Sequence, residues 1–439
     1  MLRRTLHKAV VAALLSVCAA FSAHGQASGT YTPYSIYGVG DLSQPGTAYN
    51  KTMGGVGVAM RNRSFINVLN PASVTARDSL SFMTDFSVYG DNKLFNQEKI
   101  KSVSNTFNIN DLVMSFPLWH HTAMMVGIMP YSDTGFGYSF DYTDPDLIGH
   151  TGNITYSAAG SGSIYRGFAA FGASLGRRLS LGVQWNYYFG SIEKTYYTTF
   201  NDASYNSIKN GTTARLTGHS ARFGLQYEQP LGPKLTLGIG ATYNTATKLG
   251  GTMESSRFSA GSAASDTLYY KLDNLGKDSV VKLASEMTVG VSLKNPDRWM
   301  AEFDYSRSDW TGSGLDGSRG FTASKSFSAT VAEAYRFGFE IIPNANGIRY
   351  MNTVAYRVGA YHKNDYFLLD GKKVASTGIT LGVTLPIYIE YRGRSNGVTL
   401  GVDIGQRGSV SGSMIRERYI NFSIGVNLFD IWFQKMQYR

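Results

Sequence analysis

Apolar and polar residues alternate along most of this chain, starting near Ser79. Val398, Leu400, Val402 and Ile404 fall on one side of a period of two, and small or polar residues, among them Asp403, fall between them. The same alternation recurs through residues 179–189, 234–244 and 418–429. A period of two is the signature of β-strands with one apolar and one polar face. The pattern therefore predicts an all-β chain from about Ser79 to Phe429.

The alternating segments number fourteen. They are residues 78–90, 105–118, 121–142, 163–175, 178–193, 213–228, 234–250, 279–293, 298–309, 329–341, 350–362, 375–389, 397–407 and 417–429. Asn153–Ala158 could form a separate strand, which would change the parity. An even number places both ends of the sheet on the same side. Trp119, Trp185 and Trp310 are aromatic residues of the kind that form girdles at membrane interfaces.

Two features favour a membrane barrel over a soluble β-sandwich, which also alternates. The polar face carries charges in mid-strand, including Arg222, Glu302 and Asp304. Short connections, such as residues 176–178 and 294–297, alternate with long ones. The long ones are residues 91–104, 144–162, 194–212, 251–278, 310–328, 363–374 and 408–416. Tight turns on one side and long loops on the other are typical of outer-membrane barrels. The barrel must close, because an open sheet edge in lipid leaves amides unpaired.

Residues 26–77 precede the strands and lack a sustained period. Their central part, Met53–Ala72, is rich in glycine, which permits close backbone approach and positive φ angles. Fourteen strands enclose a lumen too wide for wall side chains to fill. We therefore expect an antiparallel, fourteen-stranded transmembrane β-barrel (residues 78–429) with an N-terminal luminal hatch (26–77) and a C-terminal tail (430–439).

The first 25 residues are typical of a secretory signal, with Arg3, Arg4 and Lys8 preceding a short apolar stretch. A lipoprotein signal at Cys18 is the rival interpretation. Cys18 is the only cysteine, so removal of residues 1–25 excludes disulfides and cysteine metal sites. The net charge of +10 falls to +7 once the three basic residues of the signal are subtracted. The basic residues are scattered, which favours a solvated or headgroup-facing surface over nucleic-acid binding.

The hatch carries a moderately specific motif: Gly54, Gly55 and Gly57, then Asn70, Pro71 and Ala72, directly before a first strand. This arrangement resembles the FadL family of outer-membrane transporters for long-chain fatty acids and other hydrophobic molecules. The resemblance is close in the hatch and covers only the architecture of the barrel. Arg61-Asn62-Arg63 departs from the acidic residues commoner in the family. Residues 70–72 also have a purely structural interpretation, as the turn that leads into strand one.

The resemblance implies a kink in the third strand that opens a lateral gap toward lipid. Pro130, Gly135 and Gly137 are the candidate kink residues, since proline and glycine weaken a strand ladder; an ordinary bulge is the alternative. Tyr34, Ile36 and Tyr37 are candidate ligand contacts in the hatch. Arg222, Arg336 and Arg357, with Lys282, are candidate partners for a ligand carboxylate. Alternatively, these cations pair with Glu286, Glu302, Asp304 and Glu340 across the lumen.

These patterns predict passive uptake of hydrophobic or amphipathic, fatty-acid-like molecules across the outer membrane of a Gram-negative cell, without an energy source. No catalytic or cofactor motif is evident, so we expect neither an enzyme nor a bound cofactor or metal. The expected partners are outer-membrane lipid, lipopolysaccharide and a small hydrophobic ligand, with a monomeric barrel and both termini in the periplasm. The alternatives are a scaffold or shuttle barrel that binds a secreted or periplasmic protein, and a general diffusion porin.

Overall fold

A computed structural model describes residues 29–77, 80–97, 100–202, 204–259, 266–271, 281–296, 298–318, 320–321, 326–389 and 395–431. The expected signal (1–25) with Cys18, and residues 432–439 of the expected tail, lie outside these ranges.

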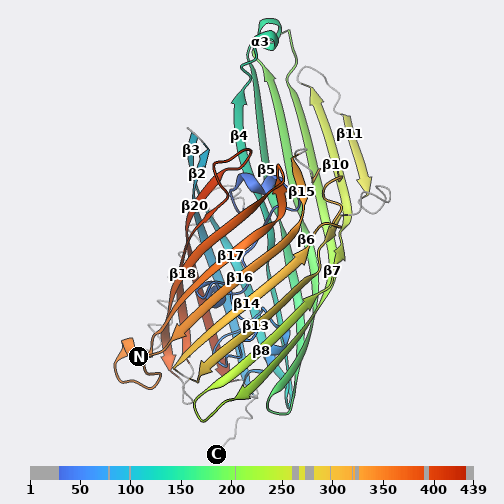
Figure 1. The fold of residues 1–439 in the computed structure, drawn as a ribbon. Coiled ribbons are helices and arrows are strands. Elements are labelled where there is room, and N and C mark those ends of the chain that lie inside the picture. Colours follow the sequence, from blue (N-terminus) through green and yellow to red (C-terminus); the bar gives the residue numbers. More distant parts are fainter. Residues whose placement is uncertain are drawn as a thin grey trace, which may run out of the picture.

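Fourteen antiparallel strands of the described chain form a closed wall (Figure 1), which confirms the predicted fold class. Closure comes from pairing of the first wall strand with the last, from Ser81 opposite Ile431 to Asn96 opposite Arg416. The wall strands are β2 (Ser81–Gln97), β3 (Ile100–Trp119), β4 (Thr122–Asp141), β5 (Ile154–Leu175), β6 (Leu179–Phe200), β7 (Ile208–Pro230), β8 (Thr236–Asn244), β13 (Glu286–Asn295), β14 (Trp299–Asp309), β16 (Val331–Ile341), β17 (Ala355–Leu369), β18 (Lys372–Ile389), β19 (Ser395–Arg407) and β20 (Arg416–Ile431).

Shorter elements decorate this wall. They are η2 (Pro33–Ile36), β1 (Asp41–Leu42), α2 (Ala48–Lys51), η3 (Pro71–Thr75), α3 (Pro145–Thr151), β9 (Thr247–Lys248), β10 (Gly250–Ser259), β11 (Asp266–Lys271), β12 (Lys282–Leu283), β15 (Phe327–Ala329) and α4 (Tyr350–Thr353). β10 continues the course of β8 along the distal part of β7 and then pairs with β11. None of the helices in the described ranges is long and apolar enough to cross a membrane.

Several connections expected to be long loops are strand instead. β2 and β3 pair from Met83 opposite Ser115 to Gln97 opposite Ile100, so most of residues 91–104 is a hairpin. Asn153–Ala158 is largely the start of β5 and not a separate strand, so the count stays even. β17 and β18 meet at a tight turn in which Asp370 and Gly371 have positive φ angles. Few apolar residues mark the β2–β3 extension in the sequence, whereas the apolar end of β17, including Tyr366 and Phe367, is buried inside.

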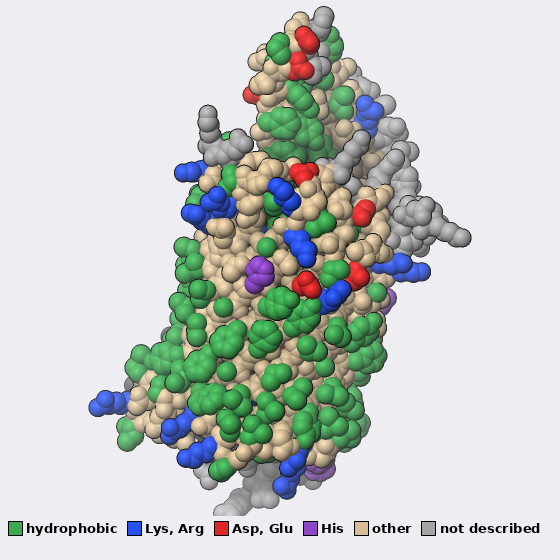
Figure 2. Space-filling view, viewed as in Figure 1, with side chains coloured by type: hydrophobic (Ala, Val, Ile, Leu, Met, Phe, Trp, Pro, Cys, Tyr) green, Lys and Arg blue, Asp and Glu red, His purple; other side chains and the backbone are tan. Residues whose placement is uncertain are grey.

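The outward side chains form an apolar band around the barrel (Figure 2). Hydrophobic side chains cover the middle and lower wall on the face shown, and charged residues gather above this band and near the lower rim. Leu400, Ile404, Phe422 and other residues of the apolar stripes are exposed on this surface. Trp119 and Trp185 are exposed too, but Trp310 is only 2% exposed and lies inside. The expectation for Trp310 is wrong, because the chain turns into the lumen after β14.

Residues 29–77, the N-terminal segment, precede the first wall strand and contact strands all around the barrel. η3 lies against β5, β6 and β7, whereas α2 contacts β19 and β20. Many of its apolar side chains, including Met53, Val56 and Met60, are fully buried. The segment therefore fills the lumen between opposite walls.

Candidate functional site: the lumen and its N-terminal segment

The glycine-rich stretch is held by two wall carboxylates. Asp304 Oδ2 in β14 accepts hydrogen bonds from the backbone amides of Gly57 (2.8 Å) and Val58 (3.1 Å). Glu302 Oε1, two residues earlier, accepts one from Ala59 at 2.7 Å. Both carboxylates are about 1% exposed. These mid-strand charges therefore bind backbone donors of the N-terminal segment and are not the cation partners that the charge pattern allowed.

Two side-chain amides, one from the N-terminal segment and one from the wall, donate hydrogen bonds to carbonyls of the glycine-rich stretch. Asn70 Nδ2 donates to the Val58 carbonyl at 2.8 Å and to the Leu225 carbonyl of β7 at 3.0 Å. Gln226 Nε2 donates to the carbonyls of Val58 (2.9 Å) and Met60 (3.1 Å). Asn70 also caps η3, since its Oδ1 accepts from the Ala72 amide at 3.0 Å. Asn70 thus forms the local turn and a contact with the wall.

Inward-facing wall glycines let the segment approach this closely. A Cβ on Gly359 of β17 would collide with the backbone nitrogen of Gly54, and one on Gly240 of β8 would collide with the Val58 carbonyl. Gly54 itself has a φ of +70°, and a Cβ there would lie 2.8 Å from the Phe337 carbonyl oxygen. The sequence interpretation missed this wall glycine set. These glycines could have been found in the sequence, because they recur at inward-facing positions of successive strands.

The wall opens between β3 and β4. Their pairing runs only from Trp119 opposite Thr122 to Leu112 opposite Ile128. Beyond this point β4 stays paired with β5, with a register shift between Pro130 and Ser132. The predicted kink residues lie along this open part of β4.

The chain's own N-terminal segment occupies the lower part of this opening. β1 pairs with β4, with Asp41 opposite Asp133. The Thr32 amide donates to the Gly135 carbonyl at 2.7 Å, and the Tyr31 hydroxyl donates to the Gly137 carbonyl. On the other bank, Asn108 of β3 donates to the Gly29 carbonyl. In this structure the opening is therefore bridged by residues 29–42.

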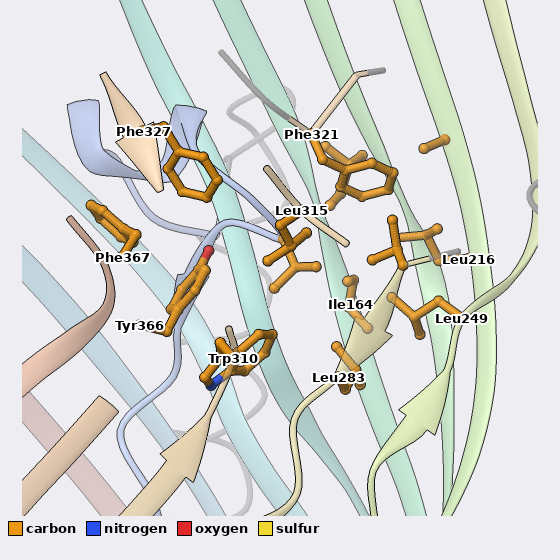
Figure 3. Packing of buried hydrophobic residues seen from close by; sticks show 14 of the residues in the cluster. Ile164, Leu216, Leu249, Leu283, Trp310, Leu315, Phe321, Phe327, Tyr366 and Phe367 are labelled. Carbon is orange, nitrogen blue, oxygen red and sulfur yellow. The ribbon is translucent and has the colours of Figure 1, made fainter. Parts of the chain in front are cut away.

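An apolar cluster closes the lumen above the segment (Figure 3). Trp310, Leu315 and Phe321 from the connection after β14 converge there with Phe327, Tyr366 and Phe367. The connection is anchored by backbone hydrogen bonds, including Gly38 to the Phe321 carbonyl at 2.9 Å. Because the connection after β14 is mostly polar, its sequence did not indicate that these few apolar residues are buried.

Two of the three predicted hatch contacts, Tyr34 and Tyr37, lie at this apolar cap. Tyr34 is buried there and donates from its hydroxyl to the Ile415 carbonyl at 2.6 Å. Tyr37 stacks on Phe327 with ring centroids 5.5 Å apart. Ile36 packs in a separate small cluster with Phe136. The three residues thus contact protein on several sides and do not line either luminal cavity described below.

A cavity of about 190 Å³ lies between the glycine-rich stretch and this apolar cap. Val58 and Leu69 line it from the segment, and Tyr131, Tyr188 and Trp310 are among its aromatic lining residues. Its charged lining includes five arginines, among them Arg166, Arg222 and Arg336 from separate strands, and five acidic residues: Asp41, Glu286, Asp304, Glu333 and Asp365. We refer to this space as the arginine cavity.

Three cations of the arginine cavity, Arg166, Arg222 and Arg336, are incompletely paired. Arg222 is 3.4 Å from Glu286, whose side chain is 44% exposed, and Arg222 Nε has no hydrogen-bond partner. Arg166 and Arg336 make no ion pair within 4.0 Å with any described residue. Arg166 Nη2 instead donates to Met129 Sδ (2.9 Å), and Arg336 donates to Ser306 Oγ at 2.8 Å. Buried charge without full compensation is costly, so these three guanidinium groups are candidate partners for an anion.

Arg357 belongs to a different cluster, in which it is paired with Glu340. Its Nε lies 2.7 Å from Glu340 Oε2, and its guanidinium is centred 4.0 Å from the Tyr49 ring centroid. The Tyr49 hydroxyl donates to Glu340 at 3.0 Å. Lys282 lies in β12, which pairs with β9 over two residues, and it lines neither cavity. The structure therefore brings Arg222 and Arg336 together and places Arg357 elsewhere.

A second cavity, of about 80 Å³, is lined mainly by polar and charged residues on the other side of β1. Arg407 pairs there with Asp365 (2.7 Å) and Asp41 (3.0 Å). Burial by itself would raise the pKa of Asp41, but Arg407, followed by Lys93 and Lys363, lowers it below its usual 3.8. No group of three or more histidine, cysteine or acidic residues suited to a metal occurs within the described ranges.

Comparison with known proteins gives one family and one fold. A family model described as BamG matches residues 2–439. Similar solved structures include the P. putida toluene transporter TodX (TM-score 0.57, 14% identity, 90% of this chain and 100% of that chain). Another is the Ralstonia pickettii toluene transporter TbuX (TM-score 0.56, 13% identity, 88% and 98%). A third is a Pseudomonas aeruginosa FadL homologue (TM-score 0.57, 9% identity, 90% and 100%). No curated protein matches the sequence.

Proposed function

Because this chain belongs to the BamG family and has the fold of FadL-type barrels, we propose that it is an outer-membrane channel that admits anionic amphiphiles through the arginine cavity. The observation that carries this proposal is the set of three incompletely paired arginines facing a luminal cavity whose lining also includes aromatic and aliphatic side chains. A carboxylate would accept charge-assisted hydrogen bonds from Arg222 and Arg166. A short hydrocarbon or aromatic part would lie against Tyr131, Tyr188 and Val58.

Passage would require the N-terminal segment to move, since it fills the lumen and bridges the wall opening. Release of residues 29–42 from β4 would connect the arginine cavity, which Leu42 and Pro130 line, with the lateral opening. This route needs no chemical energy, and its periplasmic or lateral exit follows the outer-membrane topology proposed from the turn lengths. Solved channels for toluene and other monoaromatic hydrocarbons with this fold are consistent with a small ligand.

The proposal is tested by uptake of radiolabelled octanoate into intact cells that carry or lack the protein. We expect octanoate uptake to fall in cells without it and to return when the wild-type chain is supplied. Equal uptake in both would contradict a channel role. A matched chain with Arg166 and Arg222 both changed to glutamine should restore much less uptake than wild type.

A second candidate function is a scaffold barrel that binds another protein. The observation that favours it is the double closure of the lumen, by the carboxylate-bound glycine-rich stretch and by the apolar cap. A barrel closed at two levels would not need to open in order to bind another protein. Under this hypothesis the outer parts of the wall, and not the lumen, carry the activity.

A further inference from the structure

Glu286 is the acidic residue of the arginine cavity that faces its three incompletely paired cations. The other acids of the lining are held by backbone amides of the glycine-rich stretch (Asp304), by Arg407 (Asp41 and Asp365) and by the Tyr305 hydroxyl (Glu333). The Glu286 carboxylate is 3.4 Å from Arg222, and its side chain makes no other hydrogen bond or ion pair with the described residues. It also interacts electrostatically with Arg166 and Arg336. One carboxylate is thus shared among three guanidinium groups.

The contact between Glu286 and Arg222 is weak for a luminal ion pair. Charge-assisted N–H···O bonds usually measure about 2.7–2.9 Å, and the Arg357–Glu340 pair in the same lumen measures 2.7 Å. The Glu286 side chain is 44% exposed, whereas that of Glu340 is 8% exposed. A long contact to a half-exposed carboxylate contributes little stability, so it costs little to break.

The strand register explains why the contact is long. Arg222 of β7 lies opposite Asn244 of β8, which in turn lies opposite Glu286 of β13. Arg222 and Glu286 are therefore two strands apart, or about 10 Å, and meet only by extending both side chains over β8. Glu286 is also the first residue of β13, and its ladder with β8 stops there. Holding two long side chains extended loses rotamer freedom, which weakens the contact further.

We propose that the Glu286 carboxylate is a built-in competitor, which partly occupies the anion site of Arg166, Arg222 and Arg336 until the carboxylate of an entering amphiphile displaces it. The proposal deepens the channel function and rests on it. It assigns Glu286 a role in specificity that the other acids of the cavity do not share, because their partners lie elsewhere.

Displacement of Glu286 lets a cavity with balanced charge accept an anion. Without ligand, Glu286 partly compensates the three buried guanidinium groups. With ligand, the entering carboxylate accepts hydrogen bonds from Arg222 and Arg166, and Glu286 turns toward the open part of the cavity. Breaking the internal contact lowers the affinity for every anion, and burial of a hydrocarbon part offsets this loss. Glu286 therefore sets a threshold that anions with little apolar surface do not reach.

The test is titration calorimetry of octanoate and of uncharged octanol with the purified full-length barrel. Glu286→Gln keeps the shape of the side chain and removes its charge, and Glu286→Ala removes the reach to Arg222 as a second variant. We expect both to bind octanoate about tenfold more tightly than wild type, with octanol binding unchanged. Glu193→Gln is the matched control, because Glu193 is exposed on β6 and lines neither luminal cavity. Its octanoate affinity should equal that of wild type.

A double-mutant cycle separates competition for Arg222 from a general effect of removing negative charge. Arg222→Gln should weaken octanoate binding by a larger factor in the Glu286→Gln background than in wild type, since the competitor no longer occupies Arg222. The same factor in both backgrounds would overturn the proposal, as would equal or weaker octanoate binding by Glu286→Gln and Glu286→Ala.

The same titrations distinguish this proposal from the channel proposal. Wild-type octanoate binding that depends on Arg222 but is unchanged by both Glu286 substitutions would overturn only the competitor role. Octanoate binding that appears only when Glu286 is replaced would support the competitor role and show that it blocks the cavity. Absence of octanoate binding to wild type and to both variants would overturn the two proposals together.

Discussion

Asp304 in the barrel wall accepts a 2.8 Å hydrogen bond from the backbone amide of Gly57. The same carboxylate oxygen binds Val58, and both partners are buried. The contact joins a mid-strand charge, which a lipid-facing wall alone would not need, to the glycine-rich stretch. It explains why the lumen face carries Glu302 and Asp304: they satisfy amides that no regular secondary structure pairs.

Replacement of Asp304 by alanine should loosen the N-terminal segment. Two buried amides would lose their acceptor, at a cost of about 2 kcal/mol. We expect a lower unfolding temperature in detergent, followed by the heat-modifiable gel shift. Asp309→Ala, at the exposed end of β14, is the matched control and should leave the temperature unchanged. Equal effects of the two substitutions would show that the Asp304 contact does not hold the segment.

Replacement of Gly240 by alanine should displace the glycine-rich stretch, because the new Cβ would collide with the Val58 carbonyl. Planar-bilayer recording should then show a larger conductance than in wild type. Gly232→Ala is the control, since a Cβ there meets nothing within 4 Å. Conductance of Gly240→Ala equal to that of the control would mean that the stretch does not limit the water path.

A disulfide between positions 42 and 132 tests whether residues 29–42 move. Leu42 and Ser132 are register partners of β1 and β4, and facing positions in antiparallel strands are close enough for a disulfide. In the L42C/S132C variant, oxidation should abolish octanoate uptake and reduction should restore it. The control pair V289C/Y305C joins register partners within the wall and should transport normally. Unchanged uptake by the oxidised test pair would make the segment a static plug.

Protonation of Asp41 should matter only in acid. Its folded pKa is lowered, so its contribution to stability is full above the unfolded value of about 3.8 and is lost as the pH falls below it. The difference in unfolding temperature between wild type and Asp41→Asn should be constant from about pH 8 to 5 and shrink below about pH 4. Asp146→Asn on exposed α3 serves as the control. A difference that shrinks between pH 8 and 5 would contradict the Asp41–Arg407 pairing.

The alternation of residues predicted the strand number and closure because lipid outside and water or protein inside impose opposite polarity on the two faces. It misjudged strand lengths at β2 and β3, where few residues are apolar, and at β17, whose last residues, including Tyr366 and Phe367, lie in the buried apolar cluster. It also placed Trp310 at an interface, since the inward turn of the next connection depends on a few buried contacts. Arg222 and Arg336 were identified as luminal cations, but Arg166 was missed because Met129 and the neighbouring strands, distant in sequence, define its surroundings.

Binding of octanoate to the purified full-length barrel tests the arginine cavity most directly. Affinity is measured by titration calorimetry for octanoate and for uncharged octanol, with wild type and with Arg222→Gln. We predict that wild type prefers octanoate and that Arg222→Gln weakens octanoate binding about tenfold while leaving octanol unchanged, because one charge-assisted hydrogen bond is lost. Equal affinity of wild type for octanoate and octanol, or undiminished octanoate binding in the variant, would contradict the account.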